Sequence, residues 1–132
     1  MPGFGTFSVP FESYWETYCL DAFDMIFVVY AGRLTADDIT LYKRLKSCGI
    51  STAIVRNKAD EMINSIKREN PTLSDAAAFE RSVGEVANEL KSNGLDGVPF
   101  FLVSAYMWQD KRQIGHESKL LEFMVAATAR RF

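Results

Sequence analysis

Asn57, Lys58 and Asp60 bring an amide, an ammonium group and a carboxylate together directly after the apolar run "STAIVR". One carboxylate can accept two hydrogen bonds at once, which suits a ring with two adjacent donors. Guanine has such a pair in its N1 hydrogen and 2-amino group, and adenine lacks it. Asp60 is therefore a candidate for reading guanine. Lys58 can lay its methylene stem along one face of the base, and Asn57 can tie neighbouring loops together.

A second pair of residues, Ser104-Ala105, directly follows another apolar run, "FFLV". Small residues there let backbone N–H groups approach the O6 acceptor of guanine. Each motif alone has a simple structural alternative, because Asn and Asp favour turns and helix caps and Ser and Ala are common. The two motifs together, after consecutive predicted strands, favour a guanine pocket. The alternative is an unrelated α/β domain in which Asn-Lys-Ala-Asp is only a turn.

The opening residues "MPGFGT" form a third candidate element. Pro2, Gly3 and Gly5 make a loop whose backbone can approach a terminal phosphate, with Gly3 donating its N–H. The chain contains no Gly-x-x-x-x-Gly-Lys-Ser/Thr phosphate-binding motif. We therefore expect no catalytic residue in this chain and weak nucleotide binding by it alone, because phosphate and magnesium contacts supply much of the affinity and the catalysis.

Short apolar runs alternate with amphipathic stretches along the chain. The runs "MIFVVY", "STAIVR" and "VPFFLVS" predict three strands, the first of them covered on both faces. Helical spacing and caps predict helices over residues 11–22, from Thr35 to Gly49, and over residues 59–70, 74–92 and 116–130. This alternation predicts a parallel sheet layered with helices. Both motifs lie at the carboxyl ends of strands, where open α/β sheets bind ligands.

The composition excludes several classes of protein. A chain of 132 residues with 48% hydrophobic residues fits one globular domain. A net charge of −2 argues against nucleic-acid binding. His116 is the sole histidine and has no Cys/His partners, so we expect no metal site in the chain. Cys19 and Cys48 are expected to be reduced and mostly buried, and the start lacks a signal peptide, so a cytoplasmic location is expected.

Taken together, these segments resemble the GTPase domain of the immunity-related (interferon-inducible) GTPases. "MPGFGT" is similar to that family's Asp-x-Pro-Gly-x-Gly-Thr segment without its aspartate. The stretch "FESYWETYCLDAFDMIFVV" is similar to its next helix and strand, and "AGRLTADDITL" to the loop and acidic helix start that follow. "IVRNKAD" and "FFLVS" match the two base-reading segments. The similarity covers nearly the whole chain.

The resemblance implies a three-layer, P-loop NTPase-like fold (a G domain) with a parallel sheet. Residues 1–132 would form its later part, from the second switch to the last helix, without the N-terminal strands and the phosphate loop. It implies that Asn57, Lys58 and Asp60 read guanine and that Ser104 and Ala105 complete the pocket. Gly3 would belong to the phosphate-sensing switch, and GTP or GDP with Mg²⁺ would bind to the complete protein.

The expected function is that of a GTP-binding domain fragment, with GTP hydrolysis only in the complete protein. The resemblance also implies assembly with related GTPases and peripheral association with intracellular membranes. A non-catalytic interaction module that associates with full-length relatives is the alternative. Without its usual neighbour, the strand "MIFVVY" would be a long apolar edge, so we expect the isolated chain to self-associate or to be poorly soluble.

Overall fold

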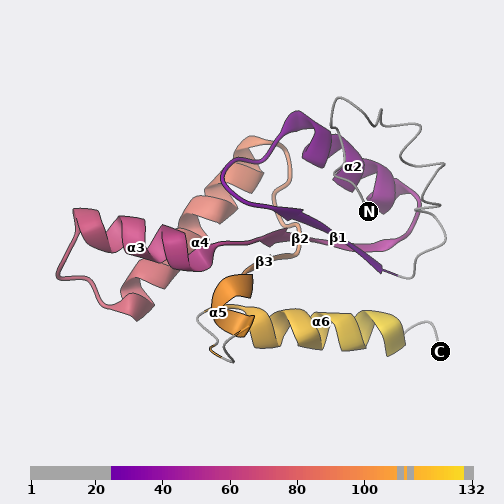
Figure 1. Cartoon of the computed structure of the whole chain (residues 1–132). Helices are drawn as coiled ribbons and strands as arrows, with labels where there is room; N and C mark the ends of the chain where they lie inside the picture. The colour runs from indigo at the N-terminus through magenta and orange to yellow at the C-terminus, as the bar shows by residue number, and fades with distance from the viewer. Residues whose placement is uncertain (1–24, 110–111, 113–114, 130–132) are drawn as a thin grey trace.

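Three parallel strands organise the chain in the computed structural model, which describes residues 25–109, 112 and 115–129. They are β1 (Met25–Tyr30), β2 (Ser51–Arg56) and β3 (Phe100–Leu102), in the order β1-β2-β3 (Figure 1). Val28 pairs with Ile54, and Val55 with Phe101. The parallel α/β sheet predicted from the sequence is confirmed. The predicted helix over residues 11–22 lies outside the described residues.

Except for the short helix after β3, the described helices begin and end close to their predicted positions. They are α2 (Ala36–Ser47), α3 (Ala59–Glu69), α4 (Asp75–Ser92), α5 (Ala105–Gln109) and α6 (Glu117–Ala129). Thr35 caps α2 in a capping box with Asp38, and the Ser74 side chain caps α4. Gly49 follows α2 with φ +75°, a left-handed conformation that favours glycine. Local capping chemistry therefore sets these boundaries.

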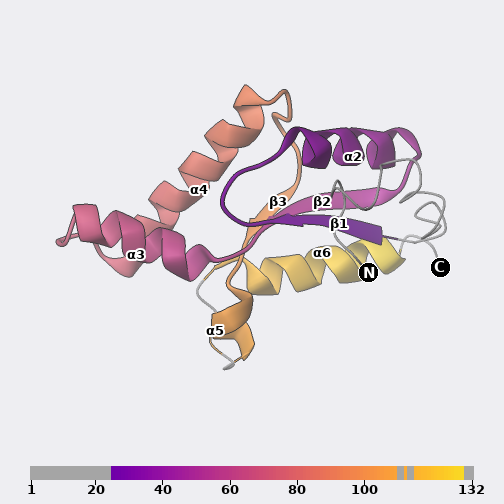
Figure 2. The ribbon, with the colours of Figure 1, turned by 45° about the horizontal axis from the view of Figure 1, so that its top comes forward.

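The sheet lies between two layers of helices (Figure 2). On one face, Val28 and Ile54 pack with Leu45 of α2 and with Val86 and Leu90 of α4 in the main core. On the other face, a smaller cluster joins the sheet to α6 through Val55, Val103 and Leu120. No helix in the described part of the chain is long and apolar enough to cross a membrane.

β1 forms one edge of the described sheet, and it is not covered on both faces as predicted. Val28 and Tyr30 are buried, but Val29 between them is 59% exposed. Alternate residues of a strand point to opposite faces, so Val29 lies on the face that carries α6. On that helix Leu121, Met124 and Val125 are also exposed. The better covered face of β1 is therefore the one that packs against α2 and α4, while on the other face Phe27 packs against the α6 cluster and Val29 is left exposed.

Two further predictions need correction, and one helix was not predicted. Cys48 ends α2 as an exposed free cysteine, because the cap residue of this helix faces solvent and not the core. β3 covers only Phe100–Leu102, since Pro99 before it has no N–H to donate and Ser104 after it turns into a helix. That helix, α5, was not predicted, and its five residues are too few to show a helical pattern.

Candidate functional site

The loop after β2 runs directly into α3 and is tied to both neighbouring strands. The Asn57 N–H donates to the Tyr30 carbonyl at 2.9 Å, and the Ala59 N–H donates to the Val103 carbonyl at 2.9 Å. Lys58 between them has φ 64° and ψ 40°, and it is the only non-glycine residue with a positive φ among those described. A left-handed lysine is strained, and such strain is typical of residues that the surrounding structure holds for function.

Asp60 and Ser104 connect the two predicted motifs. The Ser104 hydroxyl donates to Asp60 Oδ1 at 2.9 Å, although the residues are 44 positions apart. The same hydroxyl accepts from the Met107 N–H at 3.2 Å, so Ser104 also caps the short helix α5. Ser104 is fully buried and Asp60 is half-buried. The structure therefore makes Ser104 a residue that orients the Asp60 carboxylate.

Asn57 and Ala105 form the second connection. Asn57 Oδ1 accepts from the Ala105 N–H at 3.0 Å. This contact has the tying geometry expected of the asparagine amide. The same Ala105 N–H is the one expected to donate to guanine O6. When the base binds, this N–H must therefore donate to both Asn57 Oδ1 and O6, or leave Asn57 Oδ1 for O6.

The loop that follows β3 and carries Ser104 is called the β3 loop. His116 and Glu117 hold it on the side away from Asn57. The Leu102 N–H donates to His116 Nδ1 at 3.1 Å, and the His116 N–H donates to the Leu102 carbonyl at 2.8 Å. His116 thus satisfies both backbone groups of Leu102, one through its imidazole and one through its own N–H. Fully buried Glu117 accepts from the Gly115 N–H at 2.8 Å and from the Ser104 N–H at 3.4 Å. These contacts fix the backbone from which Ser104 and Ala105 extend.

His116 is held in the neutral form that this geometry requires. Burial lowers its pKa below the ordinary value, and the nearby Lys119 lowers it further, while Glu117 and Glu80 act in the opposite direction. The Phe79 ring meets the imidazole edge-on at 5.0 Å between centroids. Sequence reasoning missed this role, because only the folded chain brings residues 102 and 116 together.

Four of the five described candidate residues, all except Ala105, line a hollow of about 360 Å³ at the carboxyl end of the sheet. Its walls comprise Asn57, Lys58, Asp60, Glu61, Ser104 and Tyr106. That volume lies within the range of small-molecule pockets. Gly3 lies outside the described residues. Among the described residues, no group of three or more His, Cys, Asp and Glu is placed to hold a metal ion.

A parallel α/β sheet with these two loops at neighbouring strand ends defines part of a P-loop GTPase-like domain. The model of one family, described as "Interferon-inducible GTPase (IIGP)", matches residues 1–110, which include both loops. The chain therefore belongs to the interferon-inducible GTPase family, and family membership implies guanine-nucleotide binding, typically with Mg²⁺. No curated protein matches the chain.

Proposed function

We propose that Asn57, Lys58, Asp60, Ser104 and Ala105 form the guanine pocket of this GTPase-family domain. The observation that carries the proposal is the hydrogen bond of 2.9 Å from the Ser104 hydroxyl to Asp60 Oδ1. It joins the two loops and holds the carboxylate at the wall of the hollow. A carboxylate oriented before the base arrives loses little freedom on binding, which favours affinity.

Each residue has a distinct role in this proposal. Asp60 accepts from the N1 hydrogen and the 2-amino group of guanine, and Ala105 donates its N–H to O6. The exposed Lys58 lays its stem on one face of the ring, and Asn57 holds the loops together. Gly3, in the segment before β1, donates its N–H to the terminal phosphate.

We further propose that this chain is a fragment whose base pocket works with a phosphate loop and Mg²⁺ of a complete protein. The sequence has no Gly-x-x-x-x-Gly-Lys-Ser/Thr motif, so phosphate contacts, and with them hydrolysis, depend on residues beyond these 132. Alone, the chain then binds GDP weakly, with a dissociation constant on the order of 1 mM. Peripheral membrane association and assembly with relatives belong to the same proposal.

Exchanging Asp60 for asparagine tests the guanine pocket. Xanthine has a carbonyl where guanine has its 2-amino group, so an amide donor at position 60 suits xanthine and opposes guanine. Titration of the isotope-labelled chain with GDP and XDP, followed by amide NMR shifts, is expected to show GDP preferred by the unaltered chain. Asp60→Asn should move the GDP-to-XDP affinity ratio toward XDP by at least about tenfold.

Asp96→Asn is the matched control, because Asp96 is an exposed aspartate in the loop before β3, outside the hollow. It should leave the ratio unchanged. If GDP moves no amide signals of residues 57–60 and 104–106, or if Asp60→Asn leaves the ratio as it was, the base-reading assignment is wrong.

The second candidate function is a non-catalytic module that pairs with full-length relatives through β1. The exposed edge position of β1, with Val29 59% exposed, is the observation that favours it. Val29→Lys places a charge on this edge, whereas the same change at buried Val28 would disrupt the core. Co-purification with a full-length relative, lost in Val29→Lys, would support the module. Unchanged co-purification would exclude β1 as the surface that pairs with the relative.

A further inference from the structure

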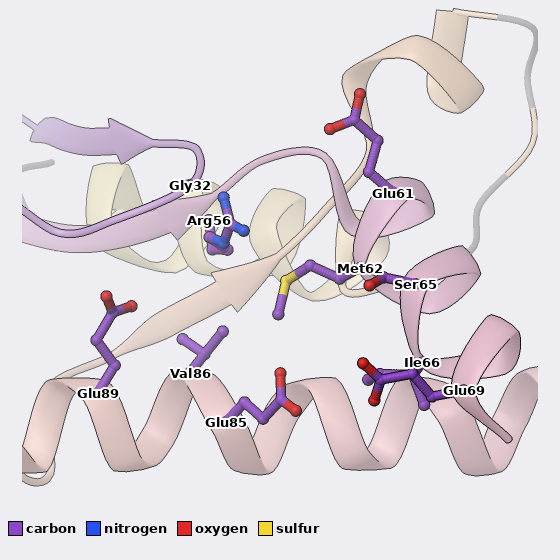
Figure 3. A pocket seen from close by; sticks show the side chains of 10 residues that line it. All are labelled: Gly32, Arg56, Glu61, Met62, Ser65, Ile66, Glu69, Glu85, Val86 and Glu89. Atoms are coloured by element: carbon purple, nitrogen blue, oxygen red, sulfur yellow. The ribbon is translucent and has the colours of Figure 1, made fainter.

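A second hollow, of about 510 Å³, lies between α3, α4 and the carboxyl ends of β1 and β2 (Figure 3). We call it the α3–α4 groove. Apolar side chains form part of its wall: Met62 reaches from α3 toward α4, and Val86 rises from α4 to meet it. The rest of the wall is charged. It carries Arg56 and four glutamates, at positions 61, 69, 85 and 89.

Arg56 is the unusual residue of this groove. It is 9% exposed, and its Nη1 has no hydrogen-bond partner. The guanidinium carbon lies 5.4 Å from the centre of the Tyr30 ring, which attracts the charge but accepts no hydrogen bond in place of an oxygen. Figure 3 shows the guanidinium beside Gly32, across the groove from α4. A buried cationic donor without an acceptor is costly, and because Nη1 is covered, the Arg56 side chain must turn toward the groove to meet a ligand oxygen.

One of the four glutamates accepts hydrogen bonds from other described residues, and the other three do not. Glu89 accepts from the Tyr30 hydroxyl at 2.8 Å and from the Leu34 N–H at 3.1 Å. Burial, together with this bond to Glu89, raises the pKa of Tyr30, so the tyrosine stays a neutral donor. Glu61, Glu69 and Glu85 are exposed, and within the described residues no partner is recorded for their carboxylates. The rim of the groove therefore attracts cations.

The groove thus offers a buried donor, an apolar wall and an anionic rim. Phosphates would be repelled by the rim, and a polyamine has no oxygen for Arg56. The described residues include no group suited to a metal ion. A lysine or arginine residue within a peptide meets all three features, with a backbone carbonyl, an aliphatic stem and a cationic head.

We propose that the α3–α4 groove binds a lysine- or arginine-bearing peptide segment of a partner protein. The Arg56 side chain turns toward the groove so that Nη1 donates to a backbone carbonyl of the segment, and the aliphatic stem packs on Met62 and Val86. The cationic head lies beside Glu69 and Glu85. This inference is independent of guanine binding, although Glu61 borders both hollows.

A fluorescein-labelled hexapeptide of alternating glycine and arginine, with both ends capped, is the probe. Its fluorescence anisotropy is measured against the full 132-residue chain at low salt. We expect saturable binding that weakens about tenfold in the double variant Glu69→Gln/Glu85→Gln, since each exposed ion pair contributes up to about a factor of five. Arg56→Met should weaken binding about fivefold through loss of the carbonyl contact.

The matched control is Asp96→Asn/Glu122→Gln, which removes the same charge from exposed positions outside the groove. It should change the affinity less than twofold. Circular dichroism of each variant verifies that the fold is retained. Equal weakening by the control pair, or equal binding of a hexapeptide with neutral citrulline in place of arginine, would overturn the proposal. So would an absence of saturable binding.

Discussion

Arg56 and Asn57 are neighbours at the end of β2, yet their side chains are in opposite situations. Asn57 reaches toward the β3 loop, and its amide oxygen accepts from Ala105. Arg56 enters the α3–α4 groove, and its Nη1 has no partner. At the candidate guanine site the two loops hydrogen-bond to each other, while in the groove the buried Nη1 of Arg56 has no partner among the described residues.

This difference separates a site held in shape from a site that needs a ligand to complete it. The β3 loop is fixed on one side by Asn57 and on the other by His116 and Glu117. Such a loop can present its N–H groups with little loss of freedom. In the groove, Glu89 accepts hydrogen bonds from within the chain, but Nη1 of Arg56 and the exposed rim glutamates have no partner within the described residues. Stability should therefore depend on the first region and be insensitive to Nη1 of Arg56 and to the rim glutamates.

Gly115→Ala is expected to have the largest effect on stability, because it disturbs the contacts that hold the β3 loop in place. A methyl group on Gly115 would overlap the Leu102 carbonyl oxygen and lie 3.1 Å from the Phe79 ring. The backbone would have to shift, and the paired hydrogen bonds between Leu102 and His116 would be lost. We expect the free energy of unfolding in urea to fall by about 3 kcal/mol.

Gly84→Ala provides the control for that change. Gly84 lies within α4, where an added methyl group meets nothing within 4 Å. Alanine is favoured over glycine inside a helix, so this variant should be more stable by about 1 kcal/mol. If Gly115→Ala proves as harmless as Gly84→Ala, then His116 and Glu117 do not support the loop.

The neighbouring positions 56 and 57 test the comparison directly. Asn57→Ala removes the acceptor of the exposed Ala105 N–H, which water then meets, and should lower the free energy of unfolding by about 0.5–1 kcal/mol. Arg56→Met replaces a buried unpaired charge by an apolar side chain of similar length, so stability should stay equal or rise. Urea denaturation of both variants measures these changes. A larger loss from Arg56→Met than from Asn57→Ala would reverse the comparison.

The elements were predictable from the sequence where local chemistry decides them. Thr35 and Ser74 stand where caps belong, and the runs from Met25 and Ser51 are long enough to identify as strands. Both candidate loops follow from their place at strand ends. The exposure of Val29 was not predictable, because an apolar run does not reveal which of its residues a helix will cover.

The residues that hold the site loops in place were harder to predict from the sequence. Glu117 acts on Ser104, which lies 13 residues earlier, and no local pattern encodes that contact. The helix α5 left one usable signal, since Ser104 stands three residues before Met107 as a capping serine does. The unpaired state of Arg56 Nη1 depends on Tyr30 and Glu89, which are distant from Arg56 in the sequence. Such features depend on tertiary packing.

The hydrogen bonds of the β3 loop should also depend on pH. Burial lowers the pKa of His116 in the folded chain, so in acid the unfolded state binds more protons. The stability that the neutral imidazole contributes is fully present above the ordinary value of about 6.5 and is lost as the pH falls through the folded pKa. We therefore expect the urea midpoint to fall between about pH 7.5 and pH 5.

His116→Asn tests whether that pH dependence comes from the imidazole. The asparagine oxygen can take the place of Nδ1 and accept from Leu102, but it does not titrate. The midpoint should then change less over the same pH range. An equal fall in both proteins would assign the effect to groups other than His116.

A small effect on stability is expected at Lys58, where strain and proposed function coincide. Its φ of 64° disfavours every residue with a side chain, so Lys58→Gly should raise the free energy of unfolding by about 0.5–1 kcal/mol. Lys58→Ala keeps the strain and, like glycine, lacks the stem proposed to cover the base. Both variants should lose guanine affinity, measured by NMR titration with GDP, while only glycine gains stability. If glycine restored or improved GDP binding, the strained lysine would have no part in holding the base.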